Sequence, residues 1–311
     1  MRRPLGRSGL AIEPFVLGGN VFGWTADEAT SFAVLDAFVG EGFNAIDTAD
    51  VYSRWVPGND SESERIIGRW MQARGSRDRV VLCTKVGMTM GLDGRDLRAA
   101  RIVSAVEGSL RRLQTDVIDL YQTHWPDPAT PEEETLAGYD ALLRAGKVRA
   151  IGTCNYDQTL LRGALDLAVA KGLPRYQTVQ NEFNLLNRAA YEGPVQQICL
   201  AEGLGAIPYY GLASGFLTGK YRTKADLRGA RGPRAERFMT PRGMAILAAM
   251  DGVAARTGAA LAEIALSWII AQPGITGPIA SATSVDQLQS LMRGARLVLP
   301  AEELATLSAA G

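Results

Sequence analysis

The 311-residue sequence has few of the side chains that bind metals or form disulfides. It contains one histidine and three cysteines, Cys83, Cys154 and Cys199, which lie far apart. These numbers exclude a zinc site made of cysteine and histidine, and they argue against a disulfide framework. Lysine plus arginine total 33, as do aspartate plus glutamate, so no net charge attracts nucleic acid or an anionic membrane.

The N-terminus lacks the charged-then-apolar form of a signal peptide, and no apolar run reaches the ~18 residues of a membrane span. We therefore expect a soluble, cytoplasmic protein that has small-molecule partners and no metal. What the sequence does have is enough apolar residues, 47%, to bury a large core. Chains of this length often form one α/β barrel, and no linker rich in proline or serine divides residues 1–311.

Short apolar segments alternate with segments that have the apolar spacing of helices. The predicted strands cover residues 15–18, 44–47, 80–84, 117–122, 148–152, 178–180, 205–209 and 275–279. The predicted helices cover residues 27–40, 62–73, 98–113, 131–145, 157–171, 192–202, 242–256, 260–271 and 284–293. This alternation indicates a parallel sheet covered by helices, and eight such units predict a (β/α)8 barrel.

Three further features bear on this fold. The glycine-punctuated residues 1–14 indicate a hairpin ahead of the barrel. The basic, glycine-rich residues 222–242, after strand seven, indicate a mobile flap. The alternative fold is an open doubly wound sheet, which favours a Gly-x-Gly-x-x-Gly turn after the first strand. Residues 17–23, Leu-Gly-Gly-Asn-Val-Phe-Gly, do not match that pattern.

Polar side chains end three consecutive predicted strands: Asp47, Lys85 and His124. All strand ends of this kind lie on one face of a parallel barrel, where active sites are built. Tyr52 follows Asp47 by five residues on the same face. Each residue alone has a structural explanation, as a helix cap, a packed ring or a paired charge. Their occurrence in register across three repeats favours a functional site.

These residue types suit proton transfer to an oxygen atom. A free tyrosine has a pKa of about 10, and a nearby ammonium group lowers that value by stabilising the phenolate. We therefore expect Lys85 to lower the pKa of Tyr52 and Asp47 to hold Lys85 in place. Tyr52 would then act as a general acid, while His124 donates to the same oxygen from the other side.

Five motifs in this order resemble the aldo-keto reductases. They are residues 42–53 (GFNAIDTADVYS), 61–68 (SESERIIG), 84–87 (TKVG), 119–125 (DLYQTHW) and 215–221 (GFLTGKY). The resemblance extends almost end to end and implies a (β/α)8 barrel that reduces aldehydes and ketones with NADPH or NADH. It also implies the catalytic tetrad Asp47, Tyr52, Lys85 and His124, with Tyr52 as general acid, or as base in alcohol oxidation.

The resemblance also implies a set of cofactor-binding positions. They are Gly19, Asn20, Val21, Asp47, Cys154, Asn155, Gln180, Tyr209, Tyr210, Gly211, Leu212, Gly215, Lys220, Arg237, Ser281 and Gln287. Cys154 stands where the family has a serine that binds the nicotinamide carboxamide, so one hydrogen bond is weakened. Tyr209 matches the tyrosine that stacks on the nicotinamide ring. Tyr210 and Gly211 replace a Ser-Pro pair at the pyrophosphate.

The adenosine end departs most from the family pattern. Ser281, Thr283 and Gln287 occupy positions where the family has basic residues for the 2′-phosphate. Hydroxyl groups and a helix N-terminus still bind phosphate, but less firmly than arginine does. Arg293 or Arg237 would compensate. We expect NADPH to be preferred over NADH by a reduced margin.

Trp24, Trp55 and Trp125 follow strands one, two and four and predict an aromatic pocket with Tyr52 and His124. Such a pocket suits flat or sugar-like carbonyl compounds. An alternative function is an NADPH-binding regulatory subunit with little turnover, because such relatives keep the tetrad. The resemblance begins close to Met1 and leaves little room for a docking extension, which favours the free enzyme. A barrel hydrolase would need a metal set or an activated serine, and the sequence shows neither.

Overall fold

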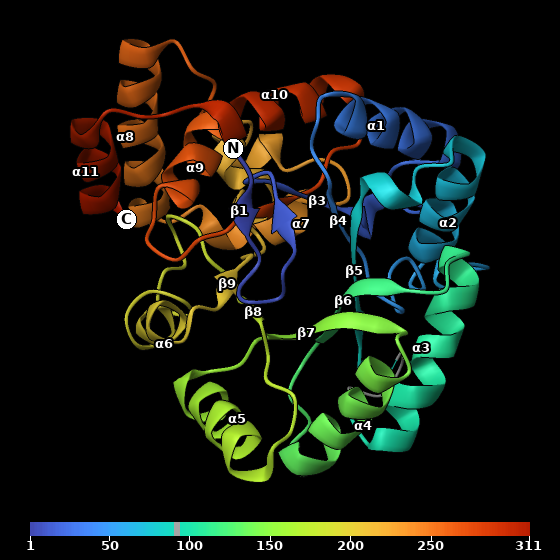
Figure 1. Cartoon of the computed structure of the whole chain (residues 1–311). Coiled ribbons are helices and arrows are strands. Elements are labelled where there is room, and N and C mark those ends of the chain that lie inside the picture. Colours follow the sequence, from blue (N-terminus) through green and yellow to red (C-terminus); the bar gives the residue numbers. More distant parts are fainter. Residues whose placement is uncertain (90–93) are drawn as a thin grey trace.

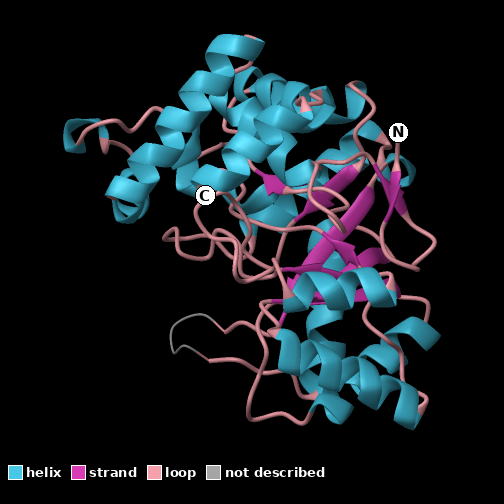
Figure 2. Cartoon of the chain, turned by 90° about the vertical axis from the view of Figure 1, so that its left-hand side faces the viewer, coloured by secondary structure: helices cyan, strands magenta, loops and turns pink. Residues whose placement is uncertain are grey.

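The computed structural model describes residues 1–89 and 94–311. Its centre is an eight-stranded parallel sheet with the strand order β10-β3-β4-β5-β6-β7-β8-β9. Helices surround this sheet, as Figures 1 and 2 show from two directions. The strands are β3 (Val16–Gly18), β4 (Ala45–Asp47), β5 (Val81–Val86), β6 (Ile118–Thr123), β7 (Val148–Cys154), β8 (Thr178–Gln180), β9 (Gly205–Ala206) and β10 (Ile279–Ala280). This arrangement confirms the predicted (β/α)8 fold.

The outer helices follow the strands in chain order. They are α1 (Glu28–Gly40), α2 (Glu62–Arg74), α3 (Ala99–Leu113), α4 (Glu132–Arg144), α5 (Gln158–Lys171), α6 (Pro194–Glu202), α8 (Pro241–Thr257), α9 (Leu261–Ile270) and α10 (Val285–Arg296). Several begin at a side-chain cap that satisfies a free backbone N–H. Asp27, Asp157 and Ser284 accept hydrogen bonds from Thr30, Leu160 and Gln287 respectively. These polar residues therefore fix where each helix starts.

The last strand differs from the prediction for residues 275–279. Only Ile279 and Ala280 pair with β3. Pro278 has no N–H to donate, which excludes regular pairing through this segment. Hydrogen bonds still join it to the end of β9, because Thr276 donates to Ala206 over 2.8 Å and Ile279 donates to Pro208 over 2.7 Å. These bonds close the sheet into a barrel.

The predicted N-terminal hairpin is present as β1 (Arg3–Pro4) and β2 (Ala11–Ile12). Its side chains Leu5 and Ile12 are buried in the same cluster as inward-facing strand residues such as Val16, Val81 and Leu120. The hairpin thus seals the amino-terminal end of the barrel. A larger apolar cluster lies between the sheet and the helices.

The segment predicted to be an irregular flap contains short helices. They are η4 (Lys224–Asp226), α7 (Gly232–Ala235) and η5 (Glu236–Phe238). A C-terminal helix that the sequence analysis did not predict, α11 (Ala301–Ala310), packs against α8, where Arg256 pairs with Glu303 at 2.6 Å. Over the described residues no single helix meets the length and hydropathy of a membrane span. Only α8 and α9 taken together do, and they are bent by 97°.

Candidate active site

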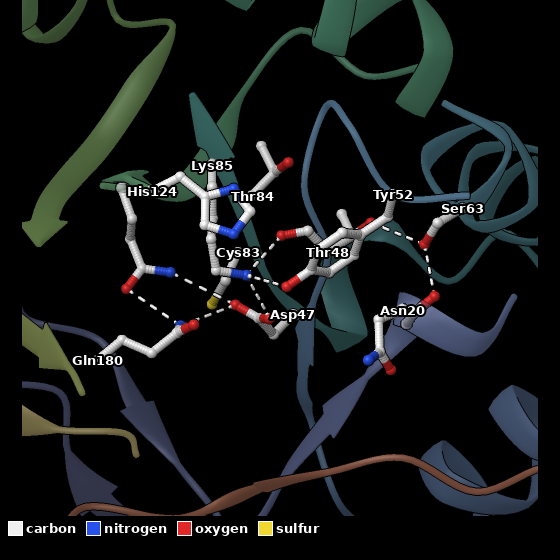
Figure 3. Close-up of polar contacts among 12 residues, drawn as sticks. Asn20, Asp47, Thr48, Tyr52, Ser63, Cys83, Thr84, Lys85, His124 and Gln180 are labelled. Atoms are coloured by element: carbon white, nitrogen blue, oxygen red, sulfur yellow. Dashed lines mark hydrogen bonds and ion pairs between the residues drawn. The ribbon is translucent and has the colours of Figure 1, made fainter. Parts of the chain in front are cut away.

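Four side chains from three consecutive repeats meet at the carboxyl end of the barrel (Figure 3). Asp47 is the last residue of β4, Lys85 lies near the end of β5, and His124 directly follows β6. Parallel pairing sets Asp47 opposite Cys83 and Lys85 opposite Gln122, so each of the three residues stands two positions further along its strand than the one before. Tyr52 reaches the same point from the loop after β4. The topology therefore brings together the four residues of the predicted tetrad.

Lys85 is the centre of the hydrogen-bond network. Its Nζ donates to Asp47 Oδ2 over 2.5 Å, to the Thr48 carbonyl over 2.8 Å and to Tyr52 Oη over 3.2 Å. The side chain is fully buried. Burial acts to lower the pKa of Lys85, but the adjacent Asp47 carboxylate raises it above its ordinary value. Lys85 is therefore a fixed cation with all three of its N–H groups in use.

Asp47 is held from its other side by two amides. Gln180 Nε2 donates to Asp47 Oδ1 over 3.0 Å, and Gln122 Nε2 lies 3.4 Å from the same atom. The carboxylate is almost completely buried, so these donors help to compensate for its lost hydration. The sequence analysis did not select Gln122. Its position in β6, paired with Lys85 of β5, could have indicated that its side chain lies near the tetrad.

The expected lowering of the Tyr52 pKa is wrong for the protein alone. The pKa of Tyr52 is raised to about 12, because burial and the Asp47 charge together outweigh the opposing effect of the Lys85 charge. Burial dominates because the phenolate would lose most of its hydration beneath the surrounding loops. Tyr52 is therefore a protonated hydrogen-bond donor at neutral pH.

His124 lies edge-on to the Tyr52 ring, with the ring centroids 5.7 Å apart. Burial lowers the pKa of His124 well below its usual 6.5, and the Lys85 charge adds to this effect. The imidazole is thus neutral. Its Nδ1 is buried and has no hydrogen-bond partner among the described residues. The residue nevertheless lines the cavity next to Tyr52, so the imidazole ring borders the space open to a ligand.

Hydroxyl groups hold the loop that carries Tyr52. Ser61 Oγ donates to the Asp50 carbonyl over 2.5 Å, and Ser53 Oγ donates to the Phe22 carbonyl over 2.6 Å. Ser63 Oγ joins Thr48 Oγ1 at 2.8 Å and the Gly19 carbonyl at 2.7 Å. The motif at residues 61–68 therefore supports the site from behind rather than contributing a reacting group.

The tetrad opens onto a cavity of about 340 Å³. The cavity is lined by most of the residues predicted to bind cofactor: Asn20, Asp47, Cys154, Asn155, Gln180, Tyr209, Tyr210, Gly211, Leu212, Gly215 and Ser281. As the described residues define it, the cavity is not lined by Gly19, Val21, Lys220, Arg237 or Gln287. Lys220 nevertheless lies next to the cavity wall, since a Cβ on Gly215 would stand 3.4 Å from Lys220 Nζ.

The wall where the nicotinamide is expected is preformed. Tyr209 Oη donates to Asn155 Oδ1 over 2.7 Å, which fixes both side chains. Asn155 has a left-handed backbone with φ 62°, and the segment from Tyr210 to Gly215 contains further left-handed residues. Strained backbone of this kind often marks ligand-binding loops. Together with Gln180 and His124, these groups line the cavity with the amide, phenol and imidazole groups that a nicotinamide cofactor and a carbonyl oxygen require.

The residues expected at the adenosine end hydrogen-bond to one another through uncharged groups. Ser281 Oγ donates to Asn20 Oδ1 over 2.6 Å, and Gln287 Oε1 accepts hydrogen bonds from Thr283. The two arginines that were expected to replace the missing basic partners of the 2′-phosphate have carboxylate neighbours. Arg293 pairs with Glu263 at 2.8 Å, and Arg237 lies 3.7 Å from Glu182.

The predicted tryptophans line the cavity mouth. Trp24 and Trp55 make an edge-to-face contact at 5.6 Å, and Trp55 lies 6.3 Å from the Tyr52 ring. The sequence analysis missed several other lining residues, among them Met88, Arg231 and Arg234. Both arginines lie in the flap segment, which has no periodic pattern from which their direction could be inferred.

Comparison with known proteins agrees with this geometry. The family model described as Aldo/keto reductase family matches residues 14–311. Among curated relatives, Protein tas of Escherichia coli is 33% identical over 97% of this chain and 95% of its own. The Uncharacterized oxidoreductase YrpG of Bacillus subtilis is 34% identical over 98% and 94%, and Aldo-keto reductase YhdN of the same organism is 34% identical over 91% and 84%.

A (β/α)8 barrel whose lysine-centred cluster of polar side chains borders a cavity has the architecture of an oxidoreductase that acts on carbonyl compounds. The chain belongs to the aldo/keto reductase family. The family resemblance predicted from the five motifs is thereby confirmed. In this family NADPH or NADH serves as the reductant for small carbonyl substrates.

Proposed function

We propose that the protein is an NADPH-dependent carbonyl reductase in which Tyr52 is the general acid. The observation that carries this proposal is the 3.2 Å contact between Lys85 Nζ and Tyr52 Oη at the edge of the cavity. The half-buried Tyr52 phenol lines the cavity and has the fixed Lys85 cation beside its oxygen. It suits a site where negative charge develops on the phenol oxygen during proton transfer.

The bound dinucleotide supplies a hydride to the carbonyl carbon. The protein's own residues manage the oxygen. Tyr52 donates its proton to the carbonyl oxygen as negative charge develops there, and the Lys85 ammonium stabilises the phenolate that is left. Neutral His124 directs a ring N–H at the same oxygen. A pKa of about 12 does not prevent this step, because an alkoxide is a stronger base than a phenolate.

In the opposite direction Tyr52 accepts the proton of an alcohol. Its raised pKa makes the phenolate scarce at neutral pH, so alcohol oxidation should become faster as the pH rises. We propose NADPH as the preferred cofactor with a reduced margin over NADH, because Ser281, Thr283 and Gln287 carry no charge. The three buried free cysteines support a cytoplasmic location.

Replacing Tyr52 tests the proposal directly. Tyr52→Phe keeps the ring but removes the proton donor, so kcat for aldehyde reduction should fall 100- to 10,000-fold. NADPH binding, measured by quenching of tryptophan fluorescence, should remain nearly unchanged. Tyr191→Phe is the matched control, since Tyr191 is buried outside the cavity and donates only to the Pro273 carbonyl.

Turnover that survives in Tyr52→Phe would remove Tyr52 from the role of acid. If the wild-type protein binds NADPH tightly but reduces no aldehyde in a panel of small substrates, the regulatory-subunit alternative would replace the proposed function. The panel should be run with both reduced cofactors.

A further inference from the structure

Two arginines reach the catalytic cavity from the flap segment. Arg231 immediately precedes α7 and Arg234 lies within it, and both line the cavity that also contains Tyr52 and His124. Arg231 is half-buried, whereas Arg234 is exposed. The neighbouring flap cations are different, because Arg222 pairs with Asp251 at 2.7 Å and Lys224 lies 3.5 Å from Glu236.

The charge of the cavity is unbalanced. Among the described residues that line it, Asp47 is the only carboxylate, and Lys85 already pairs with Asp47. His124 is neutral, as its lowered pKa shows. Around Arg231 lie two tyrosines and Arg234 rather than an acid, and burial lowers its pKa. Among the described residues that line the cavity, the two arginines therefore have no carboxylate left to match their charges.

A half-buried guanidinium without a carboxylate partner is unfavourable unless an anion binds it. Arginine is suited to this purpose, because its planar group forms paired hydrogen bonds with a carboxylate or phosphate. Two anions could reach this position. One is the pyrophosphate of the cofactor, and the other is an acidic group of the substrate.

The aromatic contacts favour the substrate. The Arg234 guanidinium lies over the Trp24 ring at 5.9 Å, Trp24 contacts Trp55, and Trp55 contacts Tyr52. A continuous aromatic wall thus runs from the arginine to the proton donor. A substrate lying along this wall would place its carbonyl at Tyr52 and its far end at Arg234.

We propose that Arg231 and Arg234 form an anion-binding subsite for the substrate. The substrate class is then an aldehyde or ketone that carries a carboxylate or phosphate at the end away from its carbonyl group. The proposal rests on the carbonyl reductase function proposed above and specifies its substrate.

The test compares 4-carboxybenzaldehyde with its methyl ester, which has the same ring and carbonyl but no charge. The measured quantity is the ratio of kcat/KM for the acid to that for the ester. Arg234→Gln and Arg231→Gln should each lower this ratio about 10-fold or more, mainly through KM for the acid. Arg228→Gln, an exposed arginine of the same flap, should leave the ratio unchanged.

Cofactor binding separates the two possible anions. The dissociation constant for NADPH should stay the same in both variants. A weaker affinity for NADPH, with the acid-to-ester ratio unchanged, would assign the arginines to the pyrophosphate and overturn the proposal. A wild-type ratio equal to that of a variant carrying both Arg231→Gln and Arg234→Gln would also overturn it.

A binding measurement keeps this test independent of turnover. The product 4-(hydroxymethyl)benzoate and its methyl ester are titrated into the NADPH-bound protein, with tryptophan fluorescence as the readout. Tighter binding of the acid, lost in Arg234→Gln, supports the subsite even if no aldehyde is reduced and the proposed function fails. Equal binding of acid and ester overturns the subsite even if neutral aldehydes are reduced well.

Discussion

Removing the Lys85 charge should lower both the stability of the fold and the rate of reduction. The structure allows the size of each loss to be predicted separately. Lys85→Met leaves the Asp47 carboxylate buried at 2% exposure with only the Gln180 and Gln122 amides near it. Breaking a buried ion pair in this way costs about 3–5 kcal/mol of unfolding free energy. The kcat for reduction should also fall 100-fold or more, because nothing then stabilises the Tyr52 phenolate.

A second substitution distinguishes the lost charge from lost packing. The double variant Lys85→Met with Asp47→Asn contains no unpaired charge, so more than half of the lost stability should return. Its activity should remain as low as that of Lys85→Met. Urea unfolding monitored by circular dichroism measures the stability, and NADPH oxidation measures the activity.

The surface pair Lys147–Glu107 provides the control. Both side chains are more than one-third exposed, so Lys147→Met should cost at most about 1 kcal/mol. The reasoning would be refuted if Lys85→Met were as stable as Lys147→Met. It would also be refuted if the double variant were less stable than Lys85→Met.

Two further predictions concern other charges. Burial and the Glu64 charge raise the pKa of Asp50 to about 7. Between about pH 4 and pH 7 the folded protein therefore keeps a proton on Asp50 that the unfolded chain has lost. As the pH rises through this range, the contribution of Asp50 makes the folded protein less stable. Asp50→Asn should therefore be more stable than wild type at about pH 8, with a difference that shrinks towards about pH 4 in urea unfolding; a constant difference would contradict this. Gln287→Arg should raise the kcat/KM ratio of NADPH to NADH roughly 10-fold by adding a charged partner for the 2′-phosphate. Gln289→Arg, on the same helix, is the control, and an equal rise in both variants would indicate a general effect of charge.

Sequence was sufficient for the parts of the site that depend on topology. Asp47, Lys85 and His124 end consecutive parallel strands, and any closed barrel brings such positions together. The same logic supplied the order of strands and most helices. The motif at residues 61–68 was visible too, although its role in supporting the Tyr52 loop depends on hydrogen bonds between distant segments.

Other features depend on burial or on irregular backbone, which sequence patterns do not encode. The net shift of the Tyr52 pKa is set by all the loops that cover it, whereas the sequence pointed only to the Lys85 charge. The last strand was misplaced because Pro278 interrupts an apolar run. Arg231 and Arg234 were missed because no periodicity tells which way a side chain in a glycine-rich segment points.

The hairpin β1–β2 covers the amino-terminal end of the barrel, whereas the cavity lies at the carboxyl end. Lys85 lies at the opposite, carboxyl end of the barrel with every N–H engaged, and the cluster that the hairpin covers consists of apolar side chains, which cannot relay a proton. If Tyr52 donates its proton as proposed, a replacement proton would therefore have to arrive through the cavity that Tyr52 and His124 line. We would then expect reprotonation of Tyr52 to follow the opening of that cavity to water.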